Sequence, residues 1–109
     1  MTAPPAALFR RWVHVREEDT GGVRVYRPAD RPLPPARGRD GIEFRPDGTF
    51  ADLRPGPTDA PVASVGRWTA AAGGRRLALA YPPGSRATTA PAGYEIVEVT
   101  TEILRLRPT

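Results

Sequence analysis

The chain has 109 residues, a formal net charge of +4 and no cysteine, and all of its 16 basic residues are arginine. This length fits one domain over residues 1–109 and excludes two independent cores. The missing cysteines exclude disulfides, thiolate nucleophiles and cysteine metal sites. With 14 Pro and 11 Gly, the composition favours short elements separated by turns over long helices.

The N-terminal residues predict neither a secretory signal nor a membrane anchor. Arg10 and Arg11 fall where the apolar stretch of a signal would lie. No part of the sequence approaches the roughly 18–20 apolar residues of a membrane span. Together with the absence of cysteine, this predicts a cytoplasmic protein that makes no membrane contact. The many Ala, Arg, Gly and Pro residues indicate GC-rich codons, so the positive charge is a weak indication of an acidic partner.

The first elements are a helical turn and a β-hairpin. Residues 4–9 follow a Pro pair and predict a turn of helix that caps the fold. Alternating apolar residues predict strands over 12–16 and 23–27, joined across a Glu-Glu-Asp-Thr-Gly-Gly turn. Residues 28–41 hold too many Pro and Arg for a strand, and we expect a long loop there.

The rest of the chain predicts further short strands. Residues 41–45 and 49–53 flank Pro-Asp-Gly, which is typical of a tight hairpin turn. In the segment 62–70, Gly66 allows close backbone approach. Strands over 76–81, 94–99 and 103–106 complete the pattern. We therefore predict an all-β fold, an antiparallel up-and-down meander of about seven to eight strands that forms a small barrel, open or closed.

Four segments, in this order, resemble the small bacterial lipocalin-like (calycin-type) domains of uncharacterised function. They are Leu8 to Trp12, Ile42 to Phe50, Gly66 to Thr69, and Leu104 to Leu106. The resemblance covers most of the chain and implies a lipocalin-like barrel that binds a small ligand or a peptide. Arg10 and Arg11 stand where larger lipocalins place a Gly before the Trp, and seven strands would fall short of the usual closed eight. Both departures argue against a deep ligand cup.

On this resemblance, we expect a binding module for a small apolar or acidic molecule or a peptide. The expected contacts are mostly aromatic side chains on the strands, with an arginine of the long loop orienting an acidic group, because arginine binds carboxylates and phosphates through two parallel hydrogen bonds. The candidate ligand-binding residues are Trp12, His14, Tyr26, Arg37, Arg39, Trp68 and Tyr81.

Two other functions stay open. An accessory subunit, as a homodimer or with a pathway partner, would use an exposed sheet edge. A small barrel enzyme acting by confinement would use His14, Glu17 or Glu18, and Tyr26 as acid and base groups. Strand alternation predicts that His14 and Glu18 share a face with Trp12.

The sequence assigns no catalytic residue, metal or cofactor. His14 is the only histidine, and one histidine with one carboxylate falls short of a metal shell. Nucleic-acid binding is not predicted, because the arginines are spread along the chain and several of the eight aromatic residues are needed for the core.

Overall fold

The computed structural model describes residues 4–30, 40–55, 61–71, 73–81 and 92–109. Among these residues, no helix has the length and apolar character needed to cross a membrane. The elements are two short 3₁₀ turns, η1 (Ala6–Leu8) and η2 (Arg16–Glu18), and the strands β1 (Arg11–His14), β2 (Arg24–Pro28), β3 (Gly41–Phe44), β4 (Thr49–Pro55), β5 (Pro61–Ala71), β6 (Arg76–Ala80), β7 (Gly93–Val99) and β8 (Leu104–Pro108).

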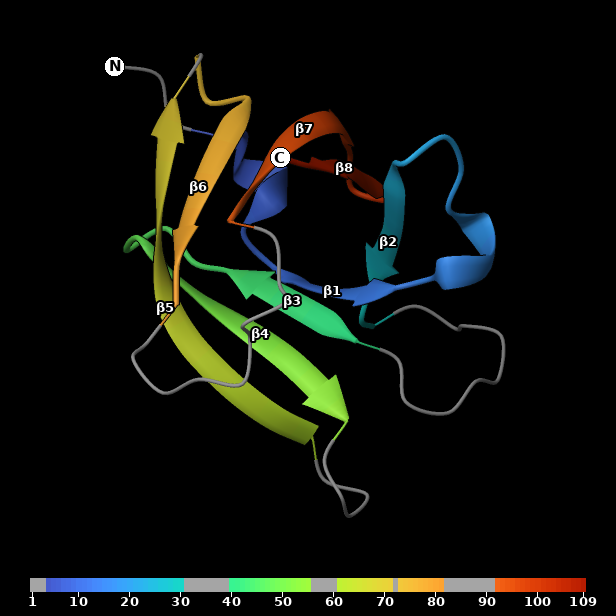
Figure 1. The fold of residues 1–109 in the computed structure, drawn as a ribbon, viewed down its shortest axis with the longest axis horizontal. Coiled ribbons are helices and arrows are strands. Elements are labelled where there is room, and N and C mark those ends of the chain that lie inside the picture. Colours follow the sequence, from blue (N-terminus) through green and yellow to red (C-terminus); the bar gives the residue numbers. More distant parts are fainter. Residues whose placement is uncertain (1–3, 31–39, 56–60, 72, 82–91) are drawn as a thin grey trace.

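The strands form one closed antiparallel barrel in the order β1-β2-β8-β7-β6-β5-β4-β3 (Figure 1). This confirms the all-β antiparallel barrel, in its closed, eight-stranded form. From β3 to β7, each strand pairs with the strand that follows it in the chain, ending with β7 and β8, as in a meander. The first hairpin is the exception, because β1 lies between β2 and β3, and β2 pairs with β8.

Several predicted element boundaries move by a few residues. The first strand ends at His14 because the chain turns into η2 after Val15, and Pro28, placed in the loop by sequence, ends β2. The third strand begins at Gly41, as predicted. The Pro-Asp-Gly hairpin is confirmed. Gly48 adopts a positive φ of 91°, and Asp47 Oδ1 accepts hydrogen bonds from the backbone N–H (3.0 Å) and hydroxyl (2.6 Å) of Thr49.

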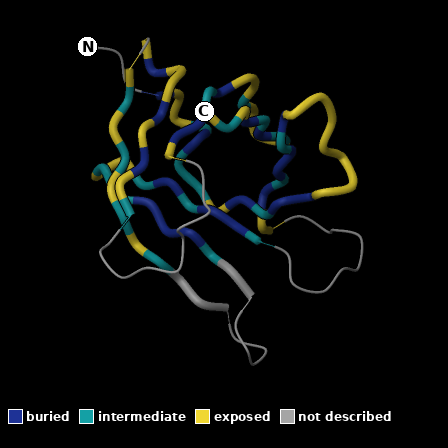
Figure 2. The backbone as a smooth tube through the Cα atoms, viewed as in Figure 1, coloured by how far each residue is buried: buried dark blue, intermediate teal, exposed yellow. Residues whose placement is uncertain are grey.

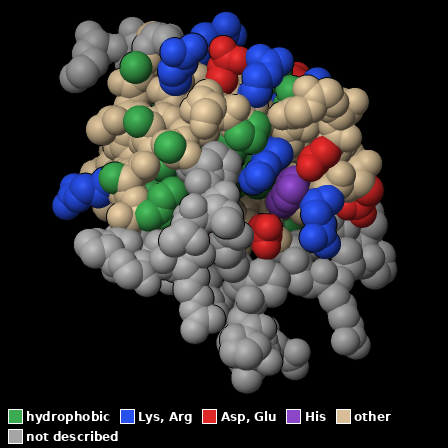
Figure 3. Space-filling model, in the orientation of Figure 1, with side chains coloured by type: hydrophobic (Ala, Val, Ile, Leu, Met, Phe, Trp, Pro, Cys, Tyr) green, Lys and Arg blue, Asp and Glu red, His purple; other side chains and the backbone are tan. Residues whose placement is uncertain are grey.

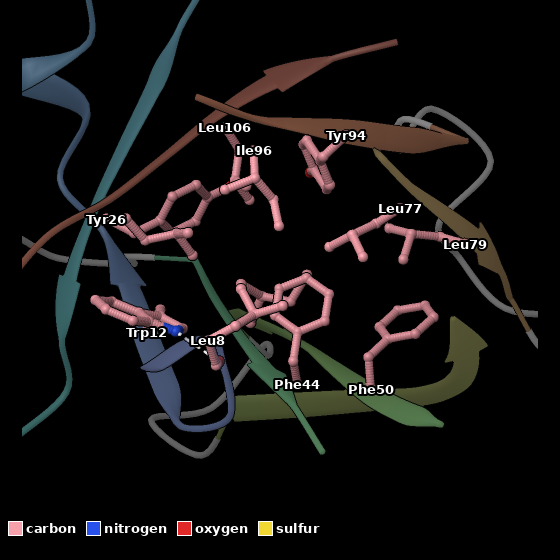
Figure 4. Packing of buried hydrophobic residues seen from close by; sticks show 12 residues of the cluster. Leu8, Trp12, Tyr26, Phe44, Phe50, Leu77, Leu79, Tyr94, Ile96 and Leu106 are labelled. Carbon is pink, nitrogen blue, oxygen red and sulfur yellow. Dashed lines mark hydrogen bonds between the residues drawn. The ribbon is translucent and has the colours of Figure 1, made fainter. Parts of the chain in front are cut away.

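Apolar side chains from all around the barrel fill its interior (Figure 4). Their spacing of two residues along each strand puts them on the same face of the sheet. The cluster comprises Leu8, Trp12, Tyr26, Ile42, Phe44, Phe50, Leu77, Leu79, Tyr94, Ile96, Leu104 and Leu106. A β-carbon on the inward Gly66 would lie 2.2 Å from the backbone oxygen of Ala80, so the predicted close approach is present.

The two ends of the barrel are covered differently. At the end where β1 begins, η1 places Leu8 in the core, and the indole Nε1 of Trp12 donates a hydrogen bond of 3.0 Å to the Leu8 carbonyl. The predicted helical cap is therefore a single 3₁₀ turn at this end, which we call the η1 end. At the opposite end, which we call the His14 end, β1 finishes and β2 begins. Exposed residues gather mainly on the η2 turn and on the outside of the β5–β6 hairpin (Figure 2).

Candidate functional site

The β1–β2 hairpin brings His14 and Tyr26 together on the inner face of the barrel. The two residues lie directly opposite each other in the strand register. Opposed residues in an antiparallel pair project to the same side. Their ring centroids are 5.0 Å apart with an interplanar angle of 31°. Both residues are buried, His14 to 7% and Tyr26 to 4% exposure.

Asp19 holds the imidazole of His14 in place. Nε2 of His14 lies 2.8 Å from Oδ2 and 3.1 Å from Oδ1 of Asp19, and Oδ1 also accepts a 2.8 Å hydrogen bond from the backbone N–H of Val25. Because a carboxylate only accepts, Nε2 carries the proton in this pair. The short loop between β1 and β2 is thereby fixed to both strands.

The predicted neighbour of His14, Glu18, lies elsewhere. Strand alternation does not continue past His14, because residues Arg16–Glu18 form the η2 turn. Glu18 is exposed and pairs with Arg27 at 2.6 Å. The hydrogen bond from Arg27 lowers the pKa of Glu18 below its usual value, although partial burial opposes the shift. The expected shared face of His14 and Glu18 is therefore wrong, and Asp19 takes the place of Glu18.

A guanidinium and a second phenol lie near Tyr26, the neighbour of the histidine. Arg24 precedes Tyr26 by two residues on β2, so both side chains project to the inner face. A guanidinium nitrogen of Arg24 donates a hydrogen bond of 3.4 Å to the hydroxyl of Tyr94. Tyr94 is on β7, and β8 lies between β7 and β2. Figure 3 shows the histidine on the face turned to the viewer, among arginine and acidic side chains.

The protonation of this cluster follows from its burial. Burial raises the pKa of Tyr26 far above its usual value, and the neighbouring Tyr94 raises it further. Burial lowers the pKa of Arg24, but Tyr94 and the hydrogen bond with Tyr26 outweigh that effect and raise it overall. At neutral pH the cluster therefore presents a charged guanidinium and a protonated Tyr26 phenol, and Tyr26 is not a base.

Asp52 is a further buried acid of the interior. It lies on β4 opposite Ile42 and Ser64 and is 8% exposed. Ile42 is in turn opposite Trp12, so Asp52 belongs to the inner face. Among the described residues, no three His, Asp or Glu side chains are grouped so as to hold a metal ion.

The other predicted contact residues that the structure describes pack against partners of their own. Trp12 is fully buried in the core. The indole of Trp68 donates to the Arg45 carbonyl at 2.9 Å and stacks on Phe9 at 5.9 Å between ring centroids, and Tyr81 meets the ring of Phe50 edge-on at 5.2 Å. Arg37 and Arg39 lie outside the described residues.

Three residues of the cluster escaped the sequence analysis. Arg24 could have been found, because it alternates with Tyr26 along one strand. Asp19 and Tyr94 had no such signal, because their positions depend on the η2 turn and on the pairing of β7 with β8. No family model, curated protein or solved structure matches this chain significantly, so the site stands on its own geometry.

Proposed function

We propose that the protein is a lipocalin-like binding module that holds a small molecule or the end of a peptide at the His14 end of the barrel. One observation carries the proposal: in an interior that is otherwise apolar apart from Asp52, polar groups gather at that end, namely the buried imidazole of His14, the buried phenols of Tyr26 and Tyr94, and the half-buried guanidinium of Arg24. Burying polar groups costs free energy unless they are hydrogen-bonded. Such groups at one end of a barrel are typical of a site that orients a ligand.

The filled core decides where a ligand can lie. Leu8, Trp12, Phe44 and Phe50 are at most 1% exposed, so side chains occupy the middle of the described barrel. A ligand therefore rests across the His14 end rather than in a deep cup.

Binding is favoured over catalysis by the state of the candidate groups. Asp19 is already occupied by His14 and by the N–H of Val25, and Tyr26 stays protonated. Glu18 is on the outside with Arg27. Of the acid and base groups named for an enzyme acting by confinement, Glu18 and Tyr26 are therefore not arranged as bases.

The accessory-subunit alternative loses its structural premise. Each of the eight described strands pairs with a neighbour on both sides, so among the residues that the structure describes no strand lacks a partner along its whole length. A homodimer or a pathway partner would have to bind by another surface. A cytoplasmic setting is part of the present proposal, on the ground that the chain has no cysteine.

Amide NMR during titration with a library of small molecules and short peptides tests the binding proposal. We expect ligand-induced shifts at residues of the His14 end, such as the amide of Val25, and none at Gly48 in the β3–β4 turn. Shifts confined to the η1 end, or a library without a single binder, would refute the proposed site.

A further inference from the structure

We propose that the ligand carries an oxyanion, a carboxylate or a phosphate group, and that Arg24 binds it together with the hydroxyls of Tyr26 and Tyr94. This inference rests on the binding function proposed above and narrows its ligand class. Arg24 suits this role by its position, its contacts and its surroundings.

Several arginines on the outer surface of the barrel have carboxylate partners. Arg11 pairs with Glu43 at 3.3 Å, and Arg107 pairs with Glu95 at 2.6 Å. Others, such as Arg67, are exposed on the outside, where water solvates the guanidinium. Arg24 differs in both respects. It projects to the inner face, and within the described part of the chain its side-chain hydrogen bonds go to tyrosines rather than to a carboxylate.

Asp19, the acid whose charge acts on Arg24, does not form an ion pair with it by direct contact. Asp19 acts on Arg24 through its charge, but its oxygens bond to His14 at 2.8 and 3.1 Å and to the Val25 N–H at 2.8 Å. A guanidinium has five N–H donors, and the hydrogen bond from Arg24 to Tyr94 is long at 3.4 Å, against about 2.7–3.2 Å for a usual N–H···O bond. Arg24 therefore keeps donors that an external acceptor can take.

The surroundings of Arg24 favour a negatively charged acceptor. Leu106 lies directly opposite Arg24 on β8 and is fully buried, so the site has an apolar floor. A charge pair is stronger beside such a surface than in open water. Tyr26 and Tyr94 add hydroxyl groups next to the guanidinium, and a protonated hydroxyl donates to an oxyanion. Together these groups make a receptor for a charged oxygen group with an apolar neighbour.

The test compares matched pairs of probes on the intact chain. Benzoate and benzamide differ in charge at nearly equal shape, and phenyl phosphate and inorganic phosphate separate a phosphate site from a carboxylate site. Amide NMR titrations of the wild type report affinity and position together. We expect benzoate or phenyl phosphate to bind at the His14 end about tenfold or more tightly than benzamide, as for the loss of one charge-assisted hydrogen bond.

Two variants and one control assign the effect to Arg24. Arg24→Gln removes the charge from the site, and Arg67→Gln removes the same charge from the outer face of β5. We expect the first to weaken oxyanion binding about tenfold or more and the second to leave it unchanged. Tyr94→Phe removes one hydroxyl, leaves the guanidinium in place, and should weaken binding several-fold. It supplies the test if Arg24→Gln fails to fold.

The outcomes separate this inference from the binding function. Equal affinity of benzoate and benzamide at the His14 end would overturn the oxyanion site and leave the binding module standing. Equal losses in Arg24→Gln and Arg67→Gln would mean that net charge alone acts, which also overturns it. If all four probes fail, the oxyanion site is refuted. The binding function falls only if the wider neutral library fails too.

Discussion

The η1 end of the barrel is built from apolar side chains, whereas the His14 end buries charged and hydroxyl-bearing ones. Leu8, Phe44 and Leu104 are at most 1% exposed, and burial of each contributes about 1.5–3 kcal/mol to stability. At the His14 end, burial of the imidazole and partial burial of the guanidinium cost free energy that hydrogen bonds only offset. Stability is therefore concentrated at one end, and the opposite end is left for recognition.

The largest effect should come from the core at the η1 end. Phe44→Ala removes a ring that is 1% exposed and lies 6.5 Å from the ring of Phe50, centroid to centroid. We expect a loss of about 3–5 kcal/mol in the free energy of unfolding, measured by urea denaturation. Val65→Ala is the matched control, because Val65 is 48% exposed and its truncation should cost less than about 0.5 kcal/mol. Similar losses in both variants would contradict the assigned core.

The next largest effect tests how closely β5 and β6 approach each other between the two ends of the barrel. Gly66→Ala places a β-carbon 2.2 Å from the backbone oxygen of Ala80 and 2.8 Å from the ring of Phe50. Because a backbone oxygen cannot move aside cheaply, we expect a loss of about 3 kcal/mol, at the upper end of the range for overpacking. Thermal unfolding measures it. A variant as stable as the wild type would show that β5 and β6 are farther apart than described.

Asp19→Ala should cost less than either, although it removes the acid from the His14 end. The substitution leaves Nε2 of His14 and the N–H of Val25 without their acceptor. The Asp19 side chain is 32% exposed, so water replaces part of what is lost, and we expect about 1–2 kcal/mol in urea denaturation. A loss as large as that of Phe44→Ala would break the contrast between the two ends, because the His14 end would then carry the fold.

The same contrast explains what the sequence could reveal. Apolar residues spaced by two predicted the strands and the hairpin around Gly48, because that spacing is local and the turn residues are specific. The partner of His14 was missed because one 3₁₀ turn breaks the alternation after Val15. Tyr94 was missed because it reaches Arg24 only through the order of β7, β8 and β2, across 70 residues of sequence.

Aromatic residues limit the sequence reading in another way. An inward aromatic on a strand has the same pattern whether it packs in a core or contacts a ligand. For Trp12, the difference lies in Leu8, which η1 carries into the barrel and whose carbonyl accepts the indole N–H. The spacing of apolar residues and the composition predict the strands of the barrel well. They do not predict which end of the barrel is filled by side chains.

The smallest effect should come from the ion pair of Glu18 and Arg27 on the outside of the barrel, which belongs to neither end. The hydrogen bond from Arg27 lowers the pKa of Glu18 below the usual value of a glutamate side chain. The pair therefore stabilises the fold at pH values above the unfolded pKa, and that contribution disappears as the pH falls through the lower, folded pKa. The side chains of Glu18 and Arg27 are 38% and 34% exposed, so solvent screening limits the contribution of the pair to about 0.2–1 kcal/mol. Urea denaturation of Glu18→Gln and the wild type should differ by this amount at pH 7 and converge in acid, and a gap that persists in acid would mean that Glu18 stabilises the fold by packing rather than by charge.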